Sequence, residues 1–165
     1  MKAVVVYESL WGNTAAIAKA IAEGIGPGAR ALSTAEADAA VTTSAALIVA
    51  GAPVQAFSLP SERMRKSISA DPKNAKNPPN LSHPLMRSWL TGLPKGKGKA
   101  AAFDTRFKWT HGGAAGKILK SLEQAGYQKA ASPQKFLVTG TYGPLKEGEL
   151  ERARAWGGEL GKLVK

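Results

Sequence analysis

Short, continuous apolar runs recur along this chain. KAVVVY at 2–7, AALIVAG at 45–51 and AAAF at 100–103 contain almost no polar positions, and KFLVTG at 135–140 is a fourth run of the same kind. Runs of this length without alternating polar residues are typical of strands that are buried on both faces of a sheet. ARALS at 29–33 predicts a weaker fifth strand.

Between these runs the apolar spacing changes to that of helices. From Thr14 onward, apolar residues stand at positions 15, 17, 18, 21, 22 and 25, and Gly24, Gly26 and Pro27 then predict the end of the helix. Further helices are predicted at 34–41, 84–93, 114–126 and 145–165.

The alternation of strands and helices predicts the fold class. Consecutive parallel strands joined by helices form right-handed crossovers, which cover both faces of a parallel sheet. The 165 residues, 44% of them hydrophobic, suit a single domain over 1–165. Residues 69–84 contain four prolines and predict an exposed loop, and the periodic pattern resumes after them. We therefore expect a three-layer α/β domain.

In a sheet of this kind a ligand binds beyond the carboxyl ends of the strands. Three loops should meet there, at 8–14, 52–60 and 104–113. The first loop stands between a strand and a helix and offers hydroxyl and amide side chains around Gly12, without a lysine. Free N–H groups at the start of a helix bind anions, so this loop suits a phosphate held by neutral hydrogen bonds.

The other two loops have a different chemistry. They supply Phe57, Phe107 and Trp109, whose flat apolar faces suit a ring system. A phosphate site beside two aromatic loops predicts a phosphorylated, planar cofactor. Ligand spacing for a metal ion and paired acids for hydrolysis are not evident, and a chain without cysteine excludes thiolate chemistry.

The sequence resembles the flavodoxin family at these loops. The phosphate loop of that family, a hydroxyl residue followed after two positions by Gly-Asn-Thr, stands here as SLWGNT at 9–14, directly after the first strand. GAPVQAF at 51–57 is similar to the family's first flavin loop, and FDTRFKWTHGG at 103–113 to its second. The resemblance implies a five-stranded doubly wound sheet in the order 2-1-3-4-5, and a non-covalently bound FMN.

The resemblance also implies which residues contact FMN. They are Ser9, Leu10, Trp11, Gly12, Asn13 and Thr14 in the phosphate loop, Pro53, Val54, Gln55, Ala56 and Phe57 in the first flavin loop, and Asp104, Thr105, Arg106, Trp109 and Gly112 in the second. Trp109 takes the place where the family commonly stacks a tyrosine, with Phe107 and His111 as rivals.

Several of these side chains have a structural alternative. Trp11 can pack at the base of its loop, and Asp104 can accept bonds from the N–H groups of its own loop. We expect Trp89 and Trp156, at helical spacing with leucines, to pack in the core, and His83 to be solvated.

Charge is the main departure from the acidic members of the resembled family. The formal net charge is +11, and residues 60–165 hold twenty of the 23 Lys and Arg residues but eight of the 12 Asp and Glu residues. A solvated basic face explains this as well as a docking surface does; if a redox partner exists, we expect it to present an acidic patch. Arg106 and Lys108 stand in the second flavin loop, where free positive charge would favour a reduced, anionic ring.

The favoured function is an FMN-binding electron carrier. A small FMN-dependent oxidoreductase of the quinone-reductase type is the first alternative, and the GxGxxG fingerprint of nicotinamide binding is absent from the sequence. The second alternative is a flavin-free module that binds nucleic acid through its basic surface. Its aromatic residues gather at the flavin loops rather than between the basic residues, which disfavours nucleic acid. The opening apolar run is too short for a signal peptide, and we expect a cytoplasmic monomer without a membrane span.

Overall fold

A computed structural model describes residues 2–165. In chain order the elements are β1 (Ala3–Tyr7), α1 (Asn13–Ile25), β2 (Ala29–Ser33), α2 (Ala39–Ser44), β3 (Leu47–Pro53), α3 (Glu62–Ala70), the 3-10 helix η1 (Pro72–Asn74), α4 (Met86–Thr91), β4 (Lys99–Arg106), α5 (Ala115–Gln124), β5 (Gln128–Lys129), β6 (Gln134–Leu137) and α6 (Glu149–Lys162).

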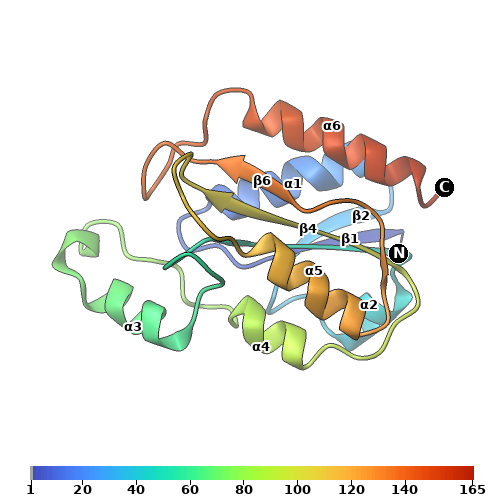
Figure 1. The fold of residues 1–165 in the computed structure, drawn as a ribbon, viewed down its shortest axis with the longest axis horizontal. Coiled ribbons are helices and arrows are strands. Elements are labelled where there is room, and N and C mark those ends of the chain that lie inside the picture. The colour runs from blue at the N-terminus through green and yellow to red at the C-terminus, as the bar shows by residue number, and fades with distance from the viewer. Residues whose placement is uncertain (1) are drawn as a thin grey trace.

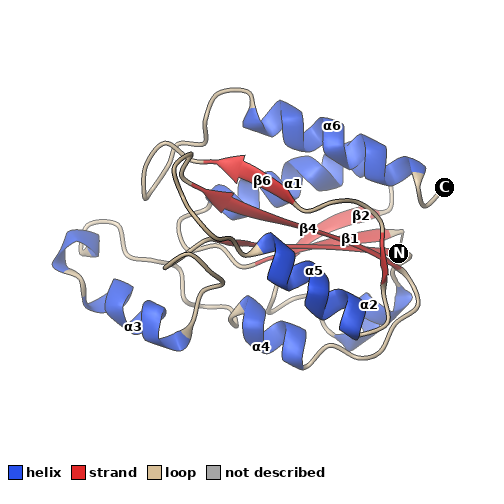
Figure 2. Cartoon of the chain, viewed as in Figure 1, coloured by secondary structure: helices blue, strands red, loops and turns tan. Residues whose placement is uncertain are grey.

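The strands form one parallel sheet between two layers of helices. Its order is β2-β1-β3-β4-β5, which confirms the predicted topology, and β6 also pairs with β4. Helices α1 and α6 lie on one face of the sheet, and α2, α4 and α5 lie on the other (Figure 1). The tip of α3 projects past the carboxyl ends of the strands, on the side to which the arrows of β4 and β6 point (Figure 2).

The central strands are buried because both of their faces carry apolar side chains. Val4 and Val6 of β1 belong to the core under α4 and α5, whereas Ala3 and Val5 belong to the core under α1 and α6. All four are fully buried. This two-sided burial explains why the strands read as continuous apolar runs in the sequence.

Trp89 and Trp156, which we expected to pack in the core, do so. The Trp89 side chain packs against the core under α4 and α5, and its Nε1 donates to the Ala37 carbonyl at 2.8 Å. Trp156 packs on the other face, with its ring centroid 6.2 Å from that of Phe136. The expected packing roles of both residues are confirmed.

The fifth strand is interrupted, which the sequence interpretation missed. Ala100 pairs with Lys129 and Phe103 with Gln134, so the edge strand has two more residues than β4 between these pairs. Pro133 lies in this gap and has no N–H to donate to the ladder. The edge therefore forms as β5 and β6, and the expected strand at 135–140 is observed at Gln134–Leu137.

Other boundaries also differ from the predicted ones. The helix expected at 34–41 begins at Ala39, because the Asp38 side chain accepts from the Val41 N–H and caps it there. β4 continues through Asp104–Arg106, where a loop was expected, because these residues pair with β6. Each difference arises from a capping or pairing bond that apolar spacing does not encode.

The segment predicted as an exposed loop at 69–84 is mostly exposed and without helices or strands after η1, but it contains the end of α3, η1 and the buried residues Asn74 and His83. Helix α3, which the sequence interpretation missed, begins after Ser61, whose hydroxyl accepts from the Met64 N–H, and runs to Ala70. η1 follows at once, and Asn74 within it is buried.

Helices α1 and α6 pack closely through glycine. A Cβ atom added at Gly157 would lie 2.2 Å from the Ile21 carbonyl oxygen, and one at Gly24 would lie 1.9 Å from the Arg154 carbonyl oxygen. Side chains at either position would separate the helices. A Cβ at the neighbouring Gly158 would only reach ordinary contact, at 3.8 Å from the Gly24 carbonyl oxygen.

We predict opposite effects of alanine at these adjacent glycines. Gly157→Ala should lower the free energy of unfolding by about 1–3 kcal/mol through overpacking, whereas Gly158→Ala should raise it by about 0.5–1 kcal/mol because alanine is the better helix former. Urea unfolding of both variants measures the difference. Equal effects of the two substitutions would contradict the close α1–α6 contact.

Candidate functional site

A cavity of about 430 Å³ lies at the carboxyl edge of the sheet. The ends of β1, β3 and β4 supply most of its wall, as the topology requires for loops that follow parallel strands. Eleven of the predicted ligand residues line it: Ser9, Leu10, Trp11, Asn13, Thr14, Pro53, Val54, Gln55, Ala56, Thr105 and Arg106. Gly12, Phe57, Asp104, Trp109 and Gly112 were predicted with them and do not line it.

The start of α1 forms one end of this cavity. Gly12 precedes the helix with φ of 95°, a conformation that glycine adopts without strain, and no side chain caps the helix. The Gly12 N–H donates to the Ser9 hydroxyl at 3.1 Å. Across residues 2–165, we find no acceptor for the N–H groups of Asn13, Thr14 and Ala15. These donors and the helix dipole together favour a bound anion.

A neutral hydrogen bond connects this loop to β4. The hydroxyls of Thr14 and Thr105 lie 2.7 Å apart, and both residues are buried. This bond holds the start of α1 against the carboxyl end of β4. Since one of the two hydroxyls must donate to the other, the remaining proton is available to a ligand in the cavity.

The loop after β3 contains an unsatisfied polar atom. Gln55 Oε1 is buried and has no hydrogen-bond partner among the described residues. A buried acceptor without a partner costs about 1–3 kcal/mol. The next two residues, Ala56 and Phe57, have φ of 45° and 66°, which are strained values for residues with side chains. A partnerless acceptor on a strained loop is typical of a ligand site.

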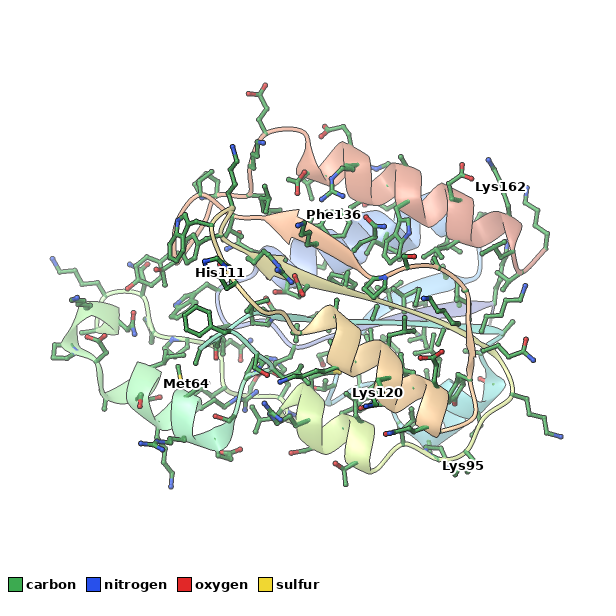
Figure 3. The ribbon with its side chains drawn as sticks, in the orientation of Figure 1. Met64, Lys95, His111, Lys120, Phe136 and Lys162 are labelled. Carbon is green, nitrogen blue, oxygen red and sulfur yellow. The ribbon has the colours of Figure 1, made fainter. Side chains whose placement is uncertain are left out.

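The two aromatic loops are joined at the mouth of the cavity. The Gly113 N–H donates to the Phe57 carbonyl at 3.0 Å. Phe107 lines the cavity and stacks on Trp109, with ring centroids 5.0 Å apart and planes 2° apart. The Trp109 side chain is 71% exposed and Phe57 61% exposed, so both lie at the outer rim. His111 is exposed on the same loop (Figure 3).

Arg106 does not supply a free positive charge to this site, contrary to our expectation for the loop. Its Nε and Nη2 donate to the two Asp104 carboxylate oxygens at 2.8 and 2.6 Å, and this bond raises the pKa of Arg106. Asp104 also accepts from the N–H groups of Ala114 and Ala115 at 3.0 Å. The alternative in which Asp104 accepts bonds from nearby backbone N–H groups is thus closer to its observed role, because these bonds fix the start of α5.

A roof over the cavity was not found from the sequence. Met64 and Ile68 of α3, Asp71, Lys73 and Asn74 around η1, and Val138, Thr141 and Tyr142 after β6 also line it. The spacing of Met64 and Ile68, behind a Ser61 cap, is the sequence signal that could have revealed the helical part. Figure 3 shows Met64 on α3, beyond the strand ends.

Hydrogen bonds hold the roof onto the phosphate loop and onto the segment after β6. Tyr142 donates its hydroxyl to Asn74 Oδ1 at 2.6 Å, and the Trp11 indole donates to the Asn77 carbonyl at 2.8 Å. The Asn80 N–H donates to the Leu10 carbonyl at 2.8 Å. Trp11 therefore both lines the cavity and packs at its loop, so its two alternatives are not exclusive.

Beneath the roof lies a buried carboxylate. Glu8, fully buried, accepts from Arg65 Nη2 at 3.2 Å and from the Met86 N–H at 2.8 Å. Burial raises the pKa of Glu8, and the Met86 hydrogen bond and the Arg65 charge oppose that rise. These bonds tie the end of β1 to both α3 and α4.

His83 is buried, so the expected solvated position was wrong. Its Nε2 accepts from the Ser9 N–H at 3.0 Å, which requires a neutral ring. Burial and the nearby Arg65 charge both lower the pKa of His83 below its ordinary value of 6.5. The neutral His83 ring thus holds Ser9, the first residue of the phosphate loop, in place.

Two kinds of feature are absent from residues 2–165. They contain no cluster of three or more acidic or histidine side chains able to hold a metal ion. None of their helices is both long and apolar enough to cross a membrane.

Comparison with known proteins supports the fold assignment. No protein-family model and no curated sequence matches this chain. A flavodoxin from the domain Archaea has a similar structure, with a TM-score of 0.69, 20% identity and 99% of each chain covered. Oxidised flavodoxin 1 from Bacillus cereus gives 0.67 at 18% identity over the full length of both chains. A WrbA-like flavodoxin protein from Agrobacterium tumefaciens gives 0.57 at 20% identity, covering 99% of this chain and 96% of its own. The chain therefore has the flavodoxin-like fold, as the sequence resemblance implied.

We predict that stability depends on His83 at mildly acidic pH. Because its pKa is lowered by folding, the unfolded chain binds a proton first, and the free energy of unfolding should fall as pH drops below about 6.5 toward the folded-state pKa. His83→Gln, whose amide oxygen can still accept from Ser9, should flatten this decline. His111→Gln removes the other histidine, which is exposed, and should leave the decline unchanged. Urea unfolding across this pH range tests it, and a parallel effect of both variants would contradict the assignment.

Proposed function

We propose that this chain binds FMN without a covalent bond and acts as an electron carrier. The observation that carries the proposal is one cavity with an uncapped helix start at one end and the orphaned Gln55 Oε1 in its wall. Bound FMN would supply reversible electron transfer, and the chain itself binds and orients it. The flavodoxin fold of the similar structures supports the same assignment.

The residues fit the phosphate end of FMN. The N–H groups of Asn13, Thr14 and Ala15 and the Thr14 or Thr105 hydroxyl are the donors for a dianion. No lysine or arginine side chain comes from residues 8–14. Hydrogen bonds and the α1 dipole would therefore hold the phosphate, and His83 would hold the Ser9 end of the loop in place.

The residues also fit the ring end. A volume of about 430 Å³ is within the range of small-molecule sites, and Val54, Phe107 and the α3 residues Met64 and Ile68 give it apolar walls. Gln55 Oε1 can accept a hydrogen bond from a ring N–H. Trp109, stacked outside on Phe107, extends the aromatic surface to the rim, where an acceptor protein could approach.

The carrier role rests on this exposed rim. Phe57 and Trp109 place aromatic surface at the mouth of the cavity, and the chain as a whole is strongly basic, which favours an acidic protein partner. We propose a cytoplasmic monomer that meets this partner transiently. A self-sufficient reductase would need a site for a second substrate, and none of the residues described for the cavity indicates one.

We predict that Thr14→Val separates FMN from riboflavin. Valine keeps the shape and removes the hydroxyl, so FMN should lose about 1.5–3 kcal/mol of binding free energy, the range for a hydrogen bond to a charged group. Riboflavin, which lacks the phosphate, should lose much less. Fluorescence titration of the apoprotein measures both, with Thr91→Val on α4 as the control. Equal losses for the two flavins would reject the phosphate assignment.

Gln55→Leu should have two effects of opposite sign. The apoprotein should gain stability, up to about 1–3 kcal/mol, because a buried acceptor without a partner is removed. FMN and riboflavin should both bind more weakly, and equally so, because the lost bond is at the end they share. Thermal unfolding of the apoprotein measures the change in stability, and titration with both flavins measures the change in affinity. Loss of apoprotein stability with unchanged flavin affinity would place Gln55 outside the site.

A further inference from the structure

A second, larger groove lies beside the candidate flavin cavity. It has a volume of about 1030 Å³ and runs between α5 and the start of α6, across the edge strand β6. Its basic side chains come from four separate parts of the chain: Arg106, Lys117, Lys120, Lys135, Lys146 and Arg152. Figure 3 shows Lys120 on α5, below the β6 strand that bears Phe136. Arg106 lines both the groove and the flavin cavity, so the two are separated by little more than this residue.

The two acidic residues of the groove are already neutralised by arginines. Asp104 is bound by Arg106, as described above. Glu149 accepts from Nε and Nη2 of Arg152 at 2.9 and 2.8 Å, and from the Leu137 N–H at 2.7 Å. These bonds lower the pKa of Glu149, so its carboxylate is charged and fully occupied. The Phe136 ring also holds Arg152 in place, since the guanidinium carbon lies 4.3 Å from the ring centroid.

The lysines of the groove have no such partners. Among the ion pairs of residues 2–165, none includes Lys117, Lys120, Lys135 or Lys146. All four are exposed, and Lys117 donates only to the neutral Ser58 hydroxyl. Four like charges that converge on one concave surface raise the free energy of the folded chain unless an anion binds there. The groove therefore presents four lysine charges that have no ion-pair partner among residues 2–165, which favours an anionic partner.

We propose that this groove, defined by Lys117, Lys120, Lys135 and Lys146, docks a carboxylate-rich segment of an acidic protein. The proposal rests on the proposed carrier function, because a partner seated there would lie against the loop that bears Trp109 and borders the flavin cavity. Lysine side chains are mobile, hydrated point charges, which suit rapid and transient association better than tight recognition. Weak electron-transfer complexes bury small interfaces, so a single groove is large enough to serve as one.

The composition of the groove favours protein over nucleic acid. Its walls contain no phenylalanine, tyrosine or tryptophan, whereas single-strand binders stack bases on aromatic side chains. Its floor includes Pro133 and Leu137, which offer apolar contact to a peptide segment. The aromatic residues of the chain that are exposed lie instead at the flavin rim.

The test compares two triple variants with the same change in charge. The groove variant is Lys120→Gln, Lys135→Gln and Lys146→Gln, and the control is Lys19→Gln, Lys97→Gln and Lys165→Gln, at exposed positions outside the groove. The probe is a fluorescent oligoglutamate peptide, and its anisotropy reports binding to the full chain at low salt. The groove variant should bind about threefold to 150-fold more weakly, because each lost exposed ion pair reduces affinity by a factor of about 1.4 to 5. The control variant should lose less than about twofold, and added salt should weaken wild-type binding.

Two outcomes would overturn the groove proposal. Equal losses in both variants would mean that the peptide responds to overall charge and not to the groove. Binding of a labelled oligothymidylate that depends on the groove, without binding of oligoglutamate, would assign the groove to nucleic acid. Flavin titration of the same samples keeps the two proposals apart, because the groove variant should bind FMN as the wild type does. Groove-dependent peptide binding without any flavin binding would refute the carrier function and leave the groove in place.

Discussion

The buried Glu8 carboxylate is the constraint on which the functional end of the molecule depends. A charge that is removed from water must be bonded on all sides, and leaving it unpaired would cost several kcal/mol. Glu8 is itself fully buried at the end of β1, so its partners come to it from other elements: Arg65 from α3 and the Met86 N–H at the start of α4. This requirement fixes α3 above the strand ends. The apolar α3 residues that roof the cavity are placed there as a consequence.

The candidate flavin cavity and the groove beside it differ in their electrostatics. In the candidate flavin cavity the phosphate end is neutral, since hydroxyls and backbone N–H groups form it and the nearby Arg106 is paired with Asp104. In the groove beside it, lysines remain unpaired while arginines neutralise both acids. Arg106 lines both sites, and its charge is offset by the Asp104 carboxylate. The proposed cofactor site and the proposed partner site thus lie side by side without competing for the same anion.

Arg106 shows that the position of a basic residue in the sequence does not determine how much positive charge it presents to a site. Its place in a loop resembling a flavin-binding loop predicted a free cation next to the ring. In the structure it belongs to β4, and its guanidinium forms a fork with the carboxylate two residues earlier, on the same face of the strand. Any influence of positive charge on bound flavin would therefore come from other residues, such as Lys73, which lines the cavity, or Lys108 at the rim, where water screens it.

The sequence by itself determined the alternation of strands and helices, because unbroken apolar runs mark buried strands and periodic apolar residues mark helices. The order of the sheet came from the resemblance to flavodoxins, and the structure confirms it. Only the tertiary structure decided the roof, the burial of His83 and the convergence of the groove lysines. The bonds responsible for the roof and for the burial of His83 connect residues 57, 74 and 78 positions apart in the chain. No local pattern encodes such pairings, because they form only when burial of a polar group at one strand end selects a partner from a distant segment.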